Sequence, residues 1–455
     1  MINDYLAVLD IGTTKIVAMV GRKDQEGNLK ILGFSERKSN GVRRGLVFNI
    51  LNVEKTIKEV IKDVEGQSGI KITEVVVGIA GQHINSRQIS HSIKSETEII
   101  INKEFVEKLI KEVYDITNDP GEKILHVFPQ EYRVNNTVVS DPVGTFSKQL
   151  TGTFHITVAL ENDLKILIMA VKNAGLKIKQ IILEPVASAE AVLTEEEKQA
   201  GIVLLDIGGG TSDLIMIKDN LVRHTAVIPF GGNAITSDIQ KAYKISEQKA
   251  EDIKIKYGSA IKDLVNKNEM INIPGINGRE TKTINVYTLA EIIECRIKEI
   301  IDTVLNVLKN AGVYDDINAG ITITGGGSLL KNLKSFIEFR TGLETTIGRP
   351  TLFSFNDKES LDNPKYATAI GLLKKGFEYI ERDAVISLEE LYKINDKTNT
   401  TPIDTENEKE DDQNRPQNEL EDSENPEEKK SKKVINKLLE KIKNTFVLND
   451  DDEEI

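Results

Sequence analysis

Cysteine is almost absent from this chain of 455 residues, with Cys295 as its single copy. One thiol cannot build a disulfide framework or a cysteine-rich zinc site. The five histidines are scattered and show no metal-ligand spacing. The net charge of −13 leaves no excess of basic surface, so we expect no nucleic-acid partner.

Long apolar runs are absent as well. No uninterrupted stretch approaches the roughly 20 apolar residues that a membrane-spanning helix needs. The first residues, MINDYLAVLD, lack the basic and apolar regions of a secretory signal. We therefore expect a reduced cytoplasmic compartment, with attachment to a membrane surface still open. The length exceeds that of one compact domain, so we expect two or more.

An internal repeat dominates what is present. A strand at 5–12 turns tightly into a strand at 14–21, and a third strand follows at 30–35. The same pattern returns from Gly201 through IVLLDIG, DLIMIKD and RHTAVIPF. Such repetition indicates two related halves. Between them, short amphipathic strands and a helix at 103–118 predict a small α+β module inserted at 85–159.

Each half opens with an Asp at the end of an apolar strand, followed by a glycine-rich turn: DIGTTK at 10–15 and DIGGGTSD at 206–213. Glycine lets the backbone approach a phosphate, and successive N–H groups form an anion-binding concavity. Asp10 and Asp206 suit Mg²⁺ held through its waters. One such turn is also typical of an ordinary hairpin. Two copies in matching positions favour a phosphate site.

A third glycine-rich loop, TGGGS at 324–328, lies between a predicted strand and a predicted helix. Its glycines are suited to pack beneath an adenine ring while the helix amino terminus faces the phosphates. The chain contains neither a dinucleotide-binding GxGxxG followed by an acidic residue nor a GxxxxGK[ST] loop.

Together the three loops resemble phosphate loop one, phosphate loop two and the adenosine loop of the actin, sugar kinase and heat-shock chaperone ATPase superfamily. EPVASAEAVL (184–193) and ATAIGLL (367–373) resemble its two connecting helices. The resemblance implies a two-lobed, actin-like α/β fold of the ribonuclease H type that binds ATP and Mg²⁺. It gives Glu184 the catalytic role of orienting the attacking water. The alternative is an exposed glutamate before a helix-starting proline.

The segments at 204–239, 250–258 (AEDIKIKYG) and 288–300 (TLAEIIECRIKEI) resemble the FtsA family of bacterial cell-division proteins. This resemblance covers residues 1 to about 385 and resumes at the carboxyl-terminal helix. It also accounts for the small insert in the first lobe. It implies nucleotide contacts from Asp10, Gly12, Thr13, Thr14, Lys15, Asp206, Gly208, Gly209, Gly210, Thr211, Ser212, Gly231, Gly232, Asn233, Glu251, Lys254, Gly325, Gly326 and Gly327.

The expected organisation follows from these matches. The first large subdomain comprises 1–84 and 161–200, with the inserted subdomain at 85–160. The second large subdomain comprises 201–230 and 311–387, with a second small subdomain at 231–310. A disordered acidic linker at 388–430 and an amphipathic helix at 431–448 complete the chain.

The predicted tail helix carries an apolar stripe with lysines off it or at its edges. A basic amphipathic helix on a long linker is typical of a membrane-surface anchor. The alternative is a helix that docks on its own core or on a partner. The residues expected to contact lipid are Val434, Ile435, Leu438, Leu439, Ile442, Phe446, Lys433, Lys437 and Lys441.

In the FtsA family such a helix attaches FtsZ polymers to the cytoplasmic face of the inner membrane at the division site. The resemblance therefore implies four partners: the FtsZ tail, other copies of the chain in actin-like filaments, anionic lipid and further division proteins. Arg296 and Lys298 are the residues expected at the FtsZ tail; the alternative is that both are solvated surface charges. Cys295 stands where proline is frequent in the family, which weakens detailed inference there. ATP turnover is expected to be weak.

Two other hypotheses remain at this stage. A sugar kinase of the same superfamily usually has a further carboxylate base, and only Glu184 has a clear claim to such a role. A pilus-assembly relative shares the loops and the insert, but the linker and tail helix are expected only of the division protein.

Overall fold

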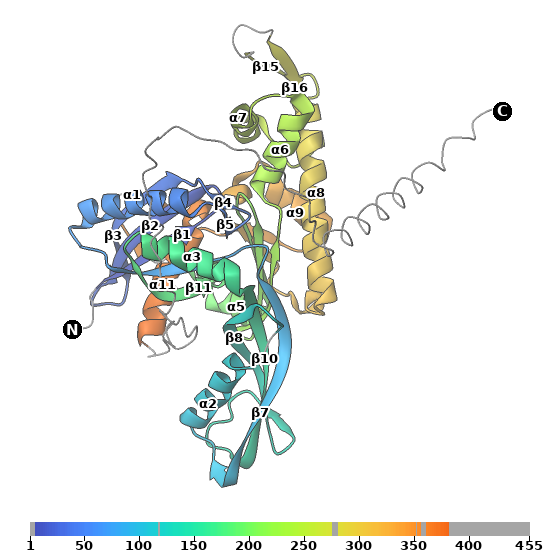
Figure 1. Cartoon of the computed structure of the whole chain (residues 1–455). Coiled ribbons are helices and arrows are strands. Elements are labelled where there is room, and N and C mark those ends of the chain that lie inside the picture. Colours follow the sequence, from blue (N-terminus) through green and yellow to red (C-terminus); the bar gives the residue numbers. More distant parts are fainter. Residues whose placement is uncertain (1–4, 117–118, 275–280, 352, 356–360, 382–455) are drawn as a thin grey trace, which may run out of the picture. The chain divides into compact units, whose positions relative to one another are not determined.

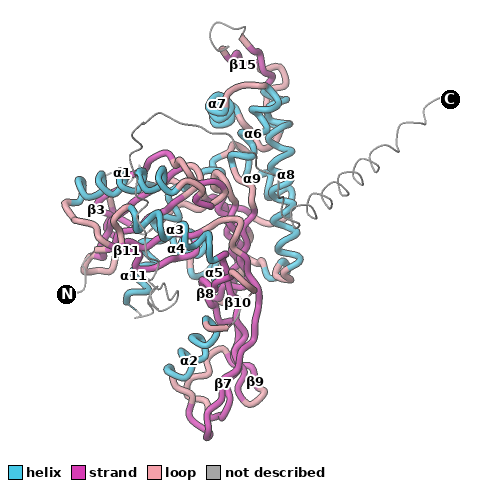
Figure 2. The backbone as a smooth tube through the Cα atoms, viewed as in Figure 1, coloured by secondary structure: helices cyan, strands magenta, loops and turns pink. Residues whose placement is uncertain are grey.

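The computed structural model describes residues 5–116, 119–274, 281–351, 353–355 and 361–381. The linker and the tail helix predicted at 388–430 and 431–448 lie outside the described residues. Figure 1 labels many of the helices and strands, and Figure 2 separates helix from strand along the backbone.

The first large sheet has six strands in the order β11-β6-β1-β2-β3-β19. Side chains alternate along its central strand β1: Ala7 and Leu9 enter the core that contains α1 and α3, whereas Leu6 and Val8 enter the core that contains α11. Helices therefore cover both faces, which explains the continuous apolar strands in the sequence. The elements are β1 (Leu6–Ile11), β2 (Lys15–Lys23), β3 (Leu29–Lys38), β6 (Glu74–Ile79), β11 (Lys177–Leu183), β19 (Phe353–Ser354), α1 (Ile50–Ser68), α3 (Glu161–Asn173), α4 (Glu184–Val192) and α11 (Ala367–Glu381).

The second large sheet repeats the first. Its order β14-β13-β12-β17-β18 matches β3-β2-β1-β6-β11 strand for strand, with three antiparallel strands followed by two parallel ones. The leading hairpins close on matching pairs, Ile11 with Ile16 and Ile207 with Ser212. The predicted internal repeat is confirmed. The strands are β12 (Ile202–Ile207), β13 (Ser212–Lys218), β14 (Leu221–Ile228), β17 (Ile321–Thr324) and β18 (Thr345–Ile347).

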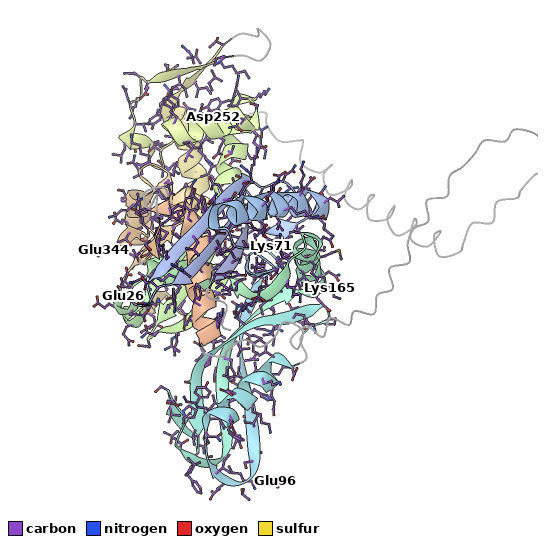
Figure 3. The ribbon with its side chains drawn as sticks, turned by 90° about the vertical axis from the view of Figure 1, so that its left-hand side faces the viewer. Glu26, Lys71, Glu96, Lys165, Asp252 and Glu344 are labelled. Carbon is purple, nitrogen blue, oxygen red and sulfur yellow. The ribbon has the colours of Figure 1, made fainter. Side chains whose placement is uncertain are left out.

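The insert is an α+β module with its own core around Phe154. Its strands are longer than expected, since β7 and β10 have 16 and 15 residues, and the helix ends at Tyr114. Glu96 lies near the end of the insert that points away from the large sheets (Figure 3). At its other end, Ser86 Oγ donates to Thr225 O of β14 (2.6 Å). The elements are β7 (Asn85–Ile100), α2 (Lys103–Tyr114), β8 (Glu122–Val134), β9 (Thr137–Val139) and β10 (Phe146–Leu160).

Of the remaining helices, α5 precedes the second hairpin and the others follow it. The sequence did not predict helix α5, although Thr194 and Glu197 form a capping box that marks its start. In the described part of the chain, no helix has both the length and the apolar composition needed to span a bilayer. The elements are β4 (Val42–Arg43), β5 (Leu46–Val47), α5 (Glu195–Ala200), α6 (Gly232–Tyr243), α7 (Glu247–Tyr257), β15 (Met270–Ile273), β16 (Lys282–Asn285), α8 (Val286–Asn310) and α9 (Leu333–Thr341).

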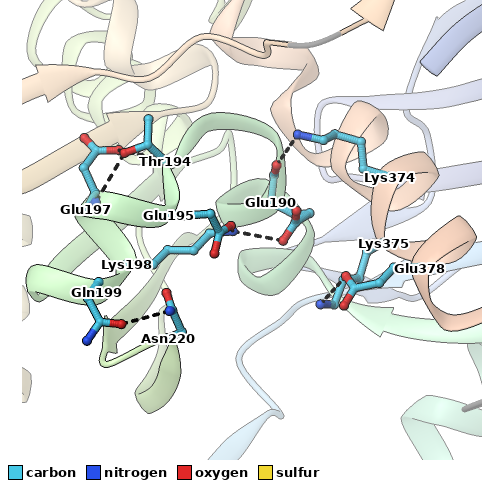
Figure 4. A network of polar contacts seen from close by, with 10 residues as sticks. All are labelled: Glu190, Thr194, Glu195, Glu197, Lys198, Gln199, Asn220, Lys374, Lys375 and Glu378. Atoms are coloured by element: carbon cyan, nitrogen blue, oxygen red, sulfur yellow. Dashed lines mark hydrogen bonds and ion pairs between the residues drawn. The ribbon is translucent and has the colours of Figure 1, made fainter. Parts of the chain in front are cut away.

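Helices α4 and α11 cross in close contact. A Cβ atom on Gly371 of α11 would overlap the carbonyl of Ala187 on α4, so only glycine fits there. Charged side chains extend the contact (Figure 4): Lys374 Nζ donates to Glu190 O (2.6 Å), and Lys198 Nζ lies 3.1 Å from Glu190 Oε2. These bonds tie α5 and both connecting helices together.

Candidate nucleotide site

The two glycine-rich turns have the same local geometry. In the first, Gly12 N donates to Lys15 O (3.0 Å), and in the second, Gly208 N donates to Thr211 O (2.9 Å). Each turn follows a strand that ends beside a buried Asp, and each is continued by an antiparallel strand. The same sequence pattern has therefore produced the same loop twice.

The two loops lie directly against each other. A Cβ atom on Gly209 would overlap Thr14 Oγ1, and one on Gly210 would overlap Thr13 Oγ1. Gly231 is packed as closely, since its Cβ would lie 2.5 Å from Gly208 O. These glycines allow backbone N–H groups and hydroxyls from both halves of the chain to gather at one place. We call this contact between residues 12–15 and 208–212 the junction. It brings together the donors that the sequence predicted for phosphate binding.

The third loop joins this junction from the side of β12. Gly325 has a φ of +79°, and a Cβ there would overlap Asp206 Oδ1. The loop lies between strand β17 and helix α9, as expected, but the helix does not follow it directly. A short 3-10 turn at Gly326–Leu329 intervenes, and α9 begins only after Asn332, whose left-handed φ of 63° interrupts the helix.

Glu251 and Lys254 meet at the start of α6. Lys254 Nζ donates to Gly232 O (3.0 Å) and lies 2.7 Å from Glu251 Oε2. Gly232 and Asn233 are in turn held by the second glycine-rich loop, through bonds of their N–H groups to Gly208 O (2.9 Å) and Gly209 O (2.8 Å). All segments assigned to the nucleotide are thus connected by described contacts.

Four carboxyl groups share the junction: Asp10, Glu184, Asp206 and Asp213. Burial, followed by the charges of Asp10, Asp213 and Asp206, raises the pKa of Glu184 well above its usual value. Burial and the charge of Asp206 raise the pKa of Asp213 to about 8. Glu184 is half-buried among these acids, so it is not the freely exposed glutamate of the alternative interpretation. Lys15 Nζ, 3.3 Å from Asp10 Oδ2, brings positive charge to the group.

Asp206 is oriented by both connecting helices. Its Oδ2 accepts from Ser188 Oγ of α4 (2.7 Å) and from Thr368 Oγ1 of α11 (3.2 Å). Burial raises the pKa of Asp206 above its usual value, and the two hydroxyl donors offset only part of this shift. These bonds fix the carboxylate at the point where the halves of the chain meet.

Sequence reasoning did not assign a role to Asp213, Ser188 or Thr368. Asp213 had a detectable signal, because it ends the DIGGGTSD segment and pairs with Asp206 across the hairpin. Its Oδ1 is buried and has no hydrogen-bond partner among the described residues. No three Asp, Glu, His or Cys side chains converge closely enough, within the described ranges, to hold a metal ion by themselves.

The two residues expected to bind the partner tail lie on α8. Arg296 already forms a two-pronged ion pair with Asp238 of α6, at 2.6 Å (Nε to Oδ2) and 3.1 Å (Nη2 to Oδ1). Lys298 is exposed, as is Cys295. Arg296 is therefore a partly buried clamp between helices, and a partner would have to share it with Asp238.

Family models match two parts of the chain. The model described as "Cell division protein FtsA" matches residues 203–371, and the model "SHS2 domain inserted in FTSA" matches residues 81–158. The second match agrees with the observed insert and shows which type of inserted domain it is.

Solved structures share the fold. The PilM-PilN type IV pilus biogenesis complex aligns with a TM-score of 0.58 at 17% identity, over 82% of this chain and 98% of that chain. MreB5 of Spiroplasma citri bound to ADP aligns with a TM-score of 0.52 at 17% identity, over 84% and 98%. At such low identity these matches show the actin-like fold alone.

Relatives in sequence are much closer. The chain is 36% identical over 372 residues to cell division protein FtsA of Neisseria meningitidis serogroup B, covering 81% of this chain and 89% of the relative. It is 32% identical over 379 residues to that of Escherichia coli strain K12, covering 81% and 90%. With two matching family models and near full-length relatives, this actin-like chain belongs to the FtsA family of cell-division proteins.

Proposed function

We propose that the chain binds Mg-ATP between its two Asp-led loops and uses the nucleotide as a switch for assembly at the division site. The contact between Gly209 and Thr14 carries this proposal. It joins the phosphate-binding donors of both halves beside four carboxyl groups. ADP bound to the MreB5 structure of the same fold supports a nucleotide here.

The residues fit a hydrated Mg²⁺ ion. Carboxyl groups outnumber the nearby ammonium group, and the buried Asp213 Oδ1 lacks a partner. No preformed protein cage exists among the described residues, which suits an ion that keeps several waters and takes other ligands from phosphates. Asp10 and Asp206 would hold this ion through water. When bound, Mg²⁺ supplies charge that offsets the phosphates and the acids.

The chain's own groups then have distinct roles. Backbone N–H groups and hydroxyls of both loops bind the phosphates, and Lys15 adds charge. Gly325, Gly326 and Gly327 line the adenine, while Glu251 and Lys254 contact the ribose or the base. Glu184 orients water toward the terminal phosphate, and hydrolysis is slow relative to assembly. All four acids gather at the phosphate loops, which favours nucleotide handling over a separate sugar site.

In this proposal the chain is also an adaptor that joins FtsZ to the membrane through its α8 face and its tail. Arg296 and Lys298 bind the FtsZ tail, and residues 431–448 hold the assembly to anionic lipid at the cytoplasmic face of the membrane. Other copies of the chain and further division proteins bind elsewhere on the body. Membership of the FtsA family supports these roles.

Liposome co-sedimentation tests the anchor. Removing 431–448 should abolish sedimentation with anionic vesicles while ATP binding is kept, and persistent lipid binding would remove the anchor. For the partner, Arg296→Glu and Lys298→Glu should each weaken binding of an FtsZ tail peptide. Lys309→Glu, on the same helix, is the matched control. Unchanged affinity in both variants would remove the α8 assignment.

A further inference from the structure

The ring of Phe230 is approached by two guanidinium groups from different parts of the chain. Arg44, in the β4–β5 turn, places its Cζ 5.9 Å from the ring centroid, and Arg296 of α8 places its Cζ 5.6 Å from it. Both distances lie within the range of cation–π attraction. Phe230 therefore connects the first half of the chain to the α8 face.

Phe230 is also tied to phosphate loop two. Ser212 Oγ donates to Phe230 O (2.8 Å). The next residue, Gly231, packs against the loop, since its Cβ would lie 2.5–2.8 Å from the carbonyl oxygens of Gly208, Thr211 and Gly209. A displacement of this loop must therefore move the backbone that carries the ring.

Arg44 is tied to phosphate loop one in a similar way. The N–H of the adjacent Gly45 donates to Thr13 Oγ1 (3.1 Å). Thr13 in turn lies against Gly210 of loop two. The β4–β5 turn thus contacts the very hydroxyl at which the two loops meet, and its arginine reaches the ring from that side.

Arg296 receives a second connection from loop two. Helix α6 begins at Gly232, whose N–H bonds to Gly208 O, and Asp238 further along α6 holds Arg296 with two hydrogen bonds. The Arg296 side chain is 22% exposed, so part of it remains open to a partner. Both phosphate loops and this surface therefore converge on Phe230 and its arginines.

We propose that Phe230 transmits the nucleotide state of the two loops to the Arg296 face of α8. This inference rests on the proposed ATP site. ATP bound between the loops displaces them, and the contacts at Gly231 and Gly45 carry this displacement to the Phe230 ring and to Arg44. When the ring and Arg44 shift, Arg296 is held less firmly and is easier to share with a partner's carboxylate. By linkage, the partner strengthens ATP binding by the same factor.

Cys295, the single cysteine, reports on this face without any engineered label. The test measures its rate of alkylation by iodoacetamide with and without a non-hydrolysable ATP analogue and Mg²⁺, with nucleotide affinity determined on the same samples. We expect the analogue to change the rate in the wild type, and the FtsZ tail peptide to bind about fivefold more tightly in its presence.

Phe230→Leu keeps an apolar side chain but removes the aromatic face. It should bind nucleotide and lose both responses, whereas Phe230→Tyr should retain them. Arg43→Gln, beside Arg44, is the control that should behave as wild type. If the wild type binds ATP but the alkylation rate of Cys295 does not change, the inference is overturned and the proposed function stands. The same holds if Phe230→Leu keeps both responses. A wild type that binds no ATP overturns the proposed function and the inference together.

Discussion

Gly209 of the second loop lies so close to Thr14 of the first that any side chain at position 209 would overlap the Thr14 hydroxyl. This contact joins residues from the two halves of the internal repeat. It makes the distance between the loops sensitive to a single methyl group.

Gly209→Ala should therefore separate the loops and weaken ATP binding. Overpacking of this kind costs about 1–3 kcal/mol, which corresponds to a roughly 5- to 150-fold loss of affinity. Titration with a fluorescent ATP analogue measures the effect. Gly66→Ala, at a helix position with no atom within 4 Å, is the control and should bind as wild type. Wild-type affinity in Gly209→Ala would mean that the loops do not share a ligand.

The acidic cluster should make the metal-free, nucleotide-free protein less stable as pH rises. The pKa of Asp213 is raised from 3.8 to about 8, so between these values the folded state binds more protons than the unfolded state. Its stability must then fall with rising pH across this window. Urea unfolding at pH 5, 6.5 and 8 measures the slope. Asp213→Asn should flatten it, and Asp252→Asn, at an exposed position on α7, should not. A slope unchanged by Asp213→Asn would contradict the shift.

The crossing of α4 and α11 should tolerate no side chain at Gly371. Gly371→Ala forces a methyl group against Ala187 O, and we expect a loss of about 3 kcal/mol in the free energy of unfolding. Thermal denaturation measures it, again with Gly66→Ala as the control. A melting temperature equal to that of the wild type would show that the helices separate easily.

Lys198 should stabilise the region where α4, α5 and α11 meet. Burial would raise the pKa of Glu190, but Lys198, Lys375 and Lys374 outweigh it and lower that pKa. Lys198→Met removes the cation that lies against the Glu190 carboxylate. It should lower the free energy of unfolding by about 2 kcal/mol at neutral pH, which is less than the loss expected for a fully buried pair. Because the pKa of Glu190 is lowered, this contribution is present above about pH 4.5 and is lost below it.

The cost of Lys198→Met should accordingly shrink toward pH 4 in urea unfolding. Glu195→Gln removes a second partner of Lys198. The Glu195 side chain is 76% exposed, so this variant should lower the free energy of unfolding by only a few tenths of a kcal/mol. Equal costs for the two variants would contradict the assignment of Glu190 as the principal partner.

Local sequence signals predicted the two hairpins, because an apolar strand that ends in Asp and is followed by glycines favours a tight turn. The roles of Ser188 and Thr368 had no such signal. They lie 18 and 162 positions from Asp206 in sequence and reach it only because α4 and α11 cross beside it. The longer insert strands and the Arg296–Asp238 pair likewise depend on tertiary contacts. The position of Asp213 could have been predicted from the sequence, since the register of the hairpin places it opposite Asp206.

Calorimetric titration of the full chain with ATP, with and without Mg²⁺, tests the central claim most directly. We predict a saturable heat corresponding to one nucleotide per chain that requires Mg²⁺ and that shows a roughly 5- to 150-fold weaker affinity in Gly209→Ala. Proton release at pH 7 should accompany it and decrease in Asp213→Asn, because Asp213, whose pKa is raised to about 8, should ionise when Mg²⁺ binds beside it. No saturable heat, wild-type affinity in Gly209→Ala, or full-strength binding without Mg²⁺ would contradict the proposed site between the two loops.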